Sequence, residues 1–150
     1  MLILYRLIIN VVCIFAPIIL RIRIYKQKED KNRYKEKLCI IKKKKPQGKL
    51  VWFHAASVGE LLSIVPLLEK LEKIKEIKSI LLTTNTLSSS KVFEKKIKSK
   101  KIIHQFFPFD KDIFAKKFLN HWLPNLVIFV ESEIWPNFIL NIKNRKIPLI

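Results

Sequence analysis

The sequence predicts an α/β fold with a parallel sheet, preceded by an apolar helix at the amino terminus. Strand-like apolar runs alternate with helical patterns, and each run ends in a cluster of polar residues. Residues 7–20, which precede all of these runs, carry no charge. Alternating strands and helices imply crossover connections and a parallel sheet. The carboxyl edge of such a sheet is where ligands bind.

The elements follow one another in a regular order. Strands are expected at residues 50–54, 79–84, 102–107 and 126–130. Helices are expected at about residues 61–75, 89–98, 113–122 and 137–143. The polar clusters at 57–60, 84–90, 108–110 and 131–133 then all lie at one edge of the sheet. This convergence predicts a binding or catalytic site at that edge.

The junction VWFHAASVGE (51–60) is the most informative segment of the chain. Gly59 allows a substrate to approach the backbone closely, and Glu60 lies in the field of a helix N-terminus. Ser57 and Glu60 also fit the capping box S-x-x-E, in which Glu60 reaches back to the Ser57 amide. The catalytic and the capping interpretations are compatible, and both remain open. His54 either lines the site or is a satisfied histidine at a strand end.

The acidic cluster after the fourth strand allows two interpretations. Glu133 stabilises the N-terminus of the following helix, for which Pro136 suits the first turn. Glu131 ends the strand itself, where a purely structural residue is more often apolar or small, and we interpret it as a site residue. Trp135 is interpreted as a packing residue.

The chain is strongly basic, with a net charge of +18 from 30 basic and 12 acidic residues. Residues 21–45 hold 12 basic and 3 acidic side chains, a net +9, and directly follow the apolar segment. This order favours a membrane anchor over a buried core helix, and no cleavage site of a removed signal peptide precedes the basic run. An insertion into one leaflet and a tilted span both remain open. The expected division is an anchor at 1–24, a basic linker at 25–48 and an α/β domain at 49–150, and the lysines at 42–45 with Pro46 are expected to be solvated.

Other function classes find little support. Cys13 and Cys39 have no metal-ligand spacing, and we expect neither a metal nor a cofactor. The chain has neither a P-loop nor a dinucleotide fingerprint. A basic nucleic-acid binder remains an alternative by charge alone. No recognised RNA-binding motif accompanies that charge, so we expect no nucleic-acid partner.

Four strings in this chain carry a family resemblance. HAASVGE (54–60), TTNTLSSS (83–90), HQFFPFD (104–110) and ESEIWPN (131–137) occur in this order after an apolar, basic amino terminus. Together they resemble the amino-terminal half of the Kdo transferases, which add 3-deoxy-D-manno-octulosonic acid (Kdo) to the lipid A precursor. Ser89 stands where the family usually has glycine. KIPLI (146–150) resembles the strand start that follows in the family.

The resemblance implies a Rossmann-like amino-terminal half of a GT-B glycosyltransferase. The acceptor, a lipid A precursor (lipid IVA), would bind in this half. The donor CMP-Kdo would bind mainly in a second, carboxyl-terminal domain that this chain lacks. Glu60 would be the general base of an inverting displacement of CMP at the cytoplasmic face of the inner membrane. The substrate-binding residues implied are Ser57, Gly59, Thr84, Thr86 and Glu131. The alternative is a non-catalytic remnant, or one half of a split enzyme, that binds membrane and acceptor only.

Overall fold

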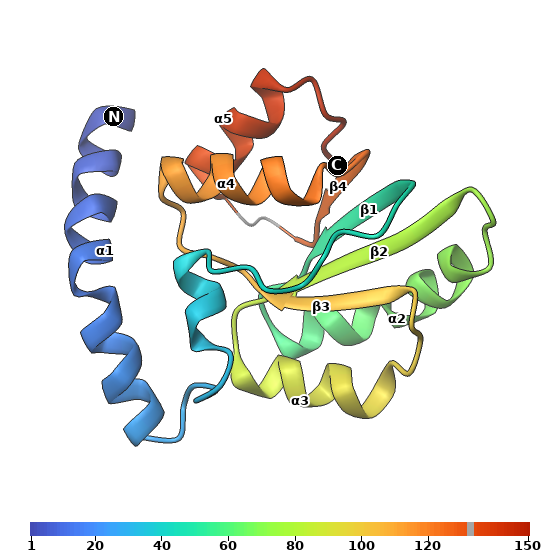
Figure 1. Cartoon of the computed structure of the whole chain (residues 1–150), viewed down its shortest axis with the longest axis horizontal. Coiled ribbons are helices and arrows are strands. Elements are labelled where there is room, and N and C mark those ends of the chain that lie inside the picture. The colour runs from blue at the N-terminus through green and yellow to red at the C-terminus, as the bar shows by residue number, and fades with distance from the viewer. Residues whose placement is uncertain (132–133) are drawn as a thin grey trace.

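Four parallel strands form a sheet in the order β3-β2-β1-β4 (Figure 1). The computed structural model describes residues 1–131 and 134–150. The strands are β1 (Lys49–His54), β2 (Ile77–Thr84), β3 (Ile102–Phe106) and β4 (Leu126–Phe129). All three strand pairings are parallel. The predicted α/β fold with a parallel sheet is therefore confirmed.

The helices lie between the strands as the alternation predicted. They are α2 (Val58–Glu72), α3 (Leu87–Lys96), α4 (Asp112–Trp122) and α5 (Pro136–Asn144). α2 begins three residues before the predicted range, because Ser57 caps it and the first turn, Val58 to Glu60, lies outside the apolar pattern. α5 begins at Pro136, where proline needs no hydrogen-bond partner for its nitrogen.

The sheet is covered by helices on both faces, which gives three layers (Figure 1). Val51 and Phe53 of β1 face a core cluster that includes residues of α2 and α3. Leu50 and Trp52 face the other cluster, which includes residues of α4 and α5. Successive side chains of a strand point to opposite faces. A central strand buried on both sides therefore reads as the continuous apolar run seen in the sequence.

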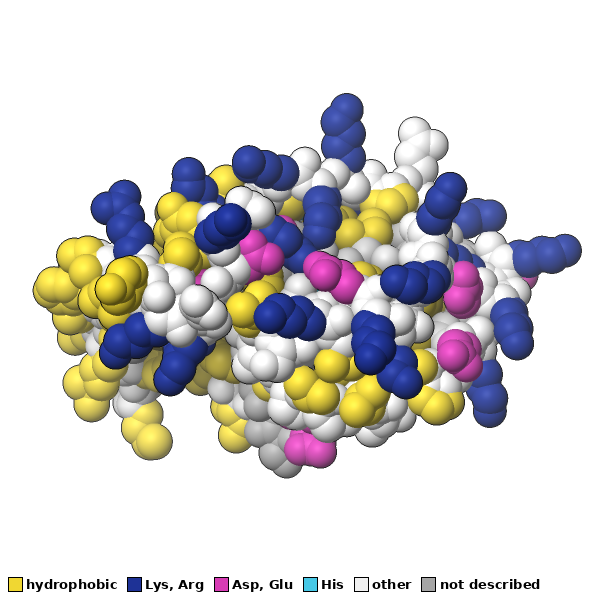
Figure 2. All heavy atoms as spheres, turned by 90° about the horizontal axis from the view of Figure 1, so that it is seen from below, with side chains coloured by type: hydrophobic (Ala, Val, Ile, Leu, Met, Phe, Trp, Pro, Cys, Tyr) yellow, Lys and Arg dark blue, Asp and Glu magenta, His cyan; other side chains and the backbone are white. Residues whose placement is uncertain are grey.

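The apolar helix α1 (Leu2–Tyr25) lies at one side of this domain (Figure 1). Of its residues, Ala16 and Leu20 are buried. Most of its other large apolar side chains are exposed, including Ile3, Ile14 and Ile18. By length and composition alone, this helix is able to cross a membrane. Figure 2 shows the hydrophobic side chains gathered over α1 at one end of the molecule, with many Lys and Arg side chains across the same face.

The basic segment that follows α1 is partly built into the domain. It contains a short 3₁₀ helix, η1 (Tyr34–Leu38), which packs against β3. Glu29, Lys37 and Cys39 are buried. Lys42 and Lys44 are exposed, as expected for a solvated linker. The charge pattern of the first part of this segment gave no sign that a lysine and a glutamate would pair inside the fold.

The strand order places a topological switch point at β1. From β1 the chain proceeds to β2 and β3 on one side, and β4 then pairs on the other side of β1. Ligands of open α/β sheets bind at the carboxyl ends of the strands at such a point. The loops after β1 and β4 flank it. Beyond β4, Leu149 forms a parallel bridge with Val127, which continues the sheet as the strand start predicted at 146–150.

Candidate active site

The loop after β1 presents Glu60 at the start of α2. The Ser57 hydroxyl accepts a hydrogen bond from the Glu60 amide (3.2 Å), which confirms the predicted cap. The Glu60 carboxylate accepts from the Ala56 amide (2.8 Å), not from the predicted Ser57 amide. This bond folds the loop back over the helix N-terminus and leaves the Glu60 side chain largely buried. The capping role is therefore real, and it also fixes the carboxylate in place.

One oxygen of the Glu60 carboxylate is left without a partner in the described residues. The bond to Ala56 uses its Oε2 atom, and Oε1 has no hydrogen-bond partner within residues 1–131 and 134–150. The N-terminus of α2 favours a negative charge at this position. A carboxylate of this kind accepts a proton from a hydroxyl that comes within hydrogen-bond reach.

Gly59 keeps the surface beside Glu60 bare. A Cβ atom built at position 59 would meet only the Ser57 hydroxyl, at 3.9 Å. Nothing described inside the protein therefore requires glycine here. Ser57 and Gly59 are both exposed, as a substrate-binding role would require.

The end of β2 has a buried threonine, Thr84, and the loop after it has an exposed one, Thr86. Thr86 is exposed and caps α3 by accepting from the Ser89 amide (3.1 Å). Ser89, at the position where the family usually has glycine, is buried with its hydroxyl 2.7 Å from that of Thr86. Thr84 is fully buried, and its hydroxyl lies 2.9 Å from His104 Nε2. Thr84 therefore packs inside the fold, next to the carboxyl edge of the sheet. A contact between Thr84 and a substrate stays a prediction.

The two buried histidines, His54 at the end of β1 and His104 in the middle of β3, are poor candidates for the base. Burial lowers the pKa of His54 to about 3, so its ring is neutral near pH 7. Its ring packs on Phe107 with centroids 4.1 Å apart. Burial, aided by the Arg33 and Lys43 charges, also lowers the pKa of His104 well below its ordinary value. Both rings act in this structure as parts of the packed edge.

Glu131 follows β4 in an unusual conformation. Its φ angle is 60°, in the left-handed region that residues other than glycine seldom adopt. The amide of the preceding residue, Val130, donates to the His54 carbonyl (2.9 Å), which holds this loop against the end of β1. The Glu131 side chain is exposed. Strain of this kind, on the order of 1–2 kcal/mol, is often stored at functional sites.

The start of α5 is capped by a residue from another loop. The Asp110 carboxylate accepts from the amides of Asn137 (3.0 Å) and Phe138 (2.9 Å) and from the Tyr5 hydroxyl of α1 (2.7 Å). Burial raises the pKa of Asp110, and these hydrogen bonds oppose the rise. Sequence reasoning gave a role at this helix start to Glu133, which lies outside the described residues, as does Ser132. It missed Asp110, whose partners are 27 and 28 residues away along the chain.

A second group that the sequence did not reveal joins the basic segment to β3. Arg33 donates to both carboxylate oxygens of Glu36, each at 3.0 Å, and Glu36 accepts from the Phe106 amide (2.8 Å). Arg33 Nη2 lies 2.8 Å from His104 Nδ1. Because an arginine only donates, His104 Nδ1 accepts, and its Nε2 carries the hydrogen that points to Thr84.

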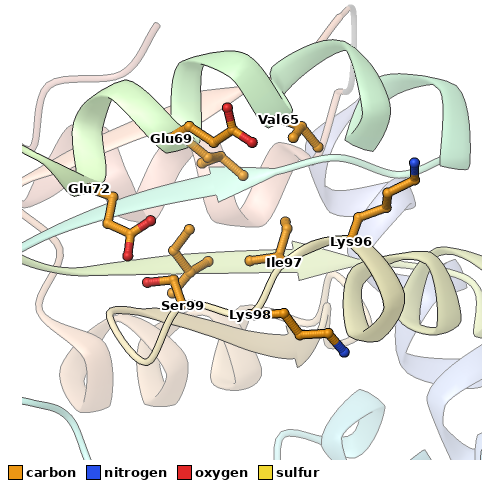
Figure 3. A pocket seen from close by; sticks show the side chains of 9 residues that line it. Val65, Glu69, Glu72, Lys96, Ile97, Lys98 and Ser99 are labelled. Atoms are coloured by element: carbon orange, nitrogen blue, oxygen red, sulfur yellow. The ribbon is translucent and has the colours of Figure 1, made fainter.

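Other features of the surface do not belong to this edge. Figure 3 shows a hollow of about 330 Å³ between the carboxyl-terminal ends of α2 and α3, which lies at the opposite edge of the sheet. In the part of the chain that the structure describes, no three His, Cys, Asp or Glu side chains are grouped so as to hold a metal ion.

Comparison with known families shows which family the chain belongs to. Residues 32–150 match the family described as 3-deoxy-D-manno-octulosonic-acid transferase (kdotransferase). The chain belongs to this family. The matched region includes the basic segment from Asn32 and all of the α/β domain, so Ser57, Glu60 and Glu131 all lie within it.

Individual Kdo transferases show the same similarity. The chain is 42% identical over 122 residues to the 3-deoxy-D-manno-octulosonic acid transferase of Rickettsia bellii, which covers 81% of this chain and 29% of that protein. It is 37% identical over 105 residues to a probable mitochondrial enzyme of the same name from Arabidopsis thaliana, covering 70% and 23%. The chain is 34% identical over 105 residues to the Haemophilus influenzae 3-deoxy-D-manno-octulosonic acid transferase, and the match covers 70% of this chain and 24% of that protein. The chain thus spans about a quarter of the length of these relatives.

Proposed function

We propose that this chain is the acceptor-binding half of a Kdo transferase and that Glu60 is its general base. A hydroxyl of the lipid A precursor loses its proton to Glu60 and attacks the anomeric carbon of CMP-Kdo, and CMP leaves with inversion. The observation that carries this proposal is the position of Glu60. Its carboxylate is fixed by the Ala56 amide at the carboxyl edge, beside the switch point of the sheet.

The remaining site residues surround that carboxylate in the proposal. Ser57, Gly59 and Thr86 are exposed on the loops after β1 and β2, and Glu131 is exposed on the loop after β4. They offer hydroxyls, backbone groups and a carboxylate to a sugar acceptor. The donor CMP-Kdo is assigned mainly to the carboxyl-terminal domain of the family, which lies beyond the matched part of the relatives. No metal or cofactor takes part.

The position of α1 supports a membrane-bound enzyme whose anchor lies within one leaflet. Near its start, Arg6 donates to Asp112 (3.2 Å) and Asn137 (2.8 Å) of the α/β domain. Near its end, Arg23 donates to Glu29 (3.1 Å). These arginines are separated by about 26 Å along a helix, close to the thickness of the hydrocarbon core of a bilayer. Because Asp112 and Asn137 hold one end of the helix, and Glu29, which is bound by Lys37 of η1 (2.7 Å), holds the other, both ends lie against the folded part of the chain, and an in-plane helix at the cytoplasmic face fits better than a span.

Glu60→Gln tests the catalytic assignment. Glutamine keeps an oxygen that accepts from the Ala56 amide, so the cap and the thermal stability should change little. It removes the base, and transfer should fall by a factor on the order of 10² to 10⁴. The measurement is Kdo transfer to the lipid A precursor with a family-type carboxyl-terminal domain supplied.

Ser63→Ala is the matched control, because the Ser63 hydroxyl donates only to the Glu60 carbonyl (2.8 Å) and leaves the carboxylate intact. This variant should transfer at nearly the normal rate. Near-normal transfer by Glu60→Gln would show that Glu60 is a cap and no more. The chain would then fit the alternative of a half that binds membrane and acceptor without catalytic groups of its own.

A further inference from the structure

A small hollow of about 130 Å³ opens at the carboxyl edge of the sheet. Its walls come from segments that follow three different strands and from η1. Asn85 follows β2, and Trp135 lies between β4 and α5. The rest of the lining consists of Lys37, Phe107, Pro108 and Phe109. Three aromatic rings therefore surround a cavity at the edge where the fold binds ligands.

Trp135 brings an unused hydrogen-bond donor to this hollow. Its Nε1 atom is buried and has no hydrogen-bond partner within residues 1–131 and 134–150. The other two tryptophans are satisfied. Trp52 Nε1 donates to the Thr83 hydroxyl (2.9 Å), and Trp122 Nε1 donates to Gln105 (3.1 Å). A buried donor without an acceptor is unfavourable, and a ligand oxygen in the hollow would satisfy it.

The lysine that lines the hollow is already paired. The Lys37 ammonium donates to Glu29 (2.7 Å) and to the Asn85 carbonyl (2.8 Å). Glu29 also accepts from Arg23 (3.1 Å), so Lys37 is paired with a carboxylate and is not an isolated cation in the hollow. The Asn85 side-chain amide forms no hydrogen bond with any residue in the described ranges, so it remains available to a ligand. The lining favours an uncharged group that has hydroxyls and an apolar face.

We propose that this hollow is a carbohydrate subsite and that Trp135 is a ligand-contacting residue. The C–H groups of a pyranose ring pack on Phe109 and Trp135. A ring oxygen or a hydroxyl of the sugar accepts a hydrogen bond from Trp135 Nε1. The Asn85 amide bonds a neighbouring hydroxyl. Apolar walls with a few convergent polar groups are the usual construction of such sites. The inference rests on the proposed function only in assigning this sugar to the acceptor.

The three indole N–H groups give a direct test on the ¹⁵N-labelled 150-residue chain, kept soluble by an unlabelled family-type carboxyl-terminal domain. In a ¹⁵N NMR titration with methyl β-D-glucopyranoside, to about 100 mM because a single sugar binds weakly, the Trp135 indole signal should shift and saturate. The Trp52 and Trp122 signals should stay in place, because both groups are buried in the core and already bonded. A motionless Trp135 signal would overturn the proposal. So would an equal shift with inorganic phosphate, which would indicate an anion site.

Trp135→Phe separates the donor from the ring. It keeps an aromatic wall and removes the N–H, and sugar affinity followed at the Phe109 amide should weaken about 3- to 10-fold. Lys96→Gln, in the hollow of Figure 3, is the matched control and should leave sugar affinity unchanged. Unchanged affinity in Trp135→Phe would refute the assignment of Trp135. None of these measurements requires transfer, so sugar binding without any transfer in the reconstituted enzyme would reject the proposed function and leave the subsite standing.

Discussion

At the scale of single residues, the candidate site combines structural and chemical roles in the same side chains. Ser57 caps α2, while Glu60 holds the Ala56 amide and keeps one oxygen for other partners. Thr86 caps α3 and is exposed. A capping motif in the sequence therefore does not argue against catalysis. It explains how a carboxylate in the first turn of a helix is held in one position.

Glu131 differs from these capping residues, because its left-handed backbone conformation lowers the stability of the fold. We expect Glu131→Asn to raise the free energy of unfolding by up to about 1 kcal/mol, because asparagine tolerates the left-handed conformation better than glutamate. If Glu131 binds substrate, transfer by the reconstituted enzyme should fall at the same time. Urea unfolding and the transfer assay measure the two effects.

Lys146→Asn is the matched control for this prediction. Lys146 has a φ angle of 55°, so the substitution relieves the same kind of strain at a position outside the proposed site. It should stabilise the chain by a similar amount and leave transfer unchanged. A stabilised Glu131→Asn variant with full transfer would mean that the carboxylate has no part in the reaction.

At the scale of helices and strands, local pattern predicted most of what the structure shows. Apolar runs located all four strands within two residues at either end. A sequence window does not reveal partners that are distant along the chain. Asp110 was part of a recognised string, but nothing near it indicated that Tyr5 and the start of α5 would share its carboxylate. Lys37 lay in a charge run, yet it is buried against Glu29. In the site, the exposed loop residues were predictable and the supporting groups were not.

The helix α1 gives a prediction at this scale. Ile14→Asp with Ile18→Asp places two charges on its exposed apolar side. Charged residues at the centre of an inserted helix cost up to about 3 kcal/mol each. Membrane binding in a vesicle sedimentation assay should therefore fall at least about 10-fold. Leu62→Asp, at an exposed apolar position of α2, should leave binding unchanged. High salt should release little of the unmodified chain, because apolar insertion is not screened.

The orientation of the same helix is open to a direct measurement. Leu2→Cys and Gln27→Cys, each made in a Cys13→Ser background, place a thiol at either end of α1. If the helix lies in one leaflet, an impermeant maleimide should label both from the cytoplasmic side, as it should label Lys75→Cys on the far edge of the domain. Labelling of position 2 from the opposite side only would show that the helix spans the bilayer.

At the scale of the whole molecule, the α/β domain forms one half of the proposed transferase. The proposal places the acceptor at the carboxyl edge of the sheet in this chain. The proposal assigns the contacts to CMP-Kdo to the part of the relatives that the chain does not match. The chain covers 29% of the Rickettsia bellii enzyme and 23% of the Arabidopsis thaliana protein. The pairing of Leu149 with Val127 also leaves the far side of residues 147–150 as a sheet edge, and Ile150 is largely exposed there. Such an edge is prone to association with other chains.

The 150-residue chain should therefore bind a lipid A precursor but fail to transfer Kdo from CMP-Kdo, and it should aggregate readily. A family-type carboxyl-terminal domain, added in trans, should improve solubility by covering the edge and should restore transfer by supplying the donor site. The same domain added to the Glu60→Gln chain is the control, because it should restore solubility without restoring the rate. Robust turnover by the 150-residue chain alone would overturn the assignment of the donor site to the second domain. The edge after β4 would then have to bind the nucleotide as well as the acceptor.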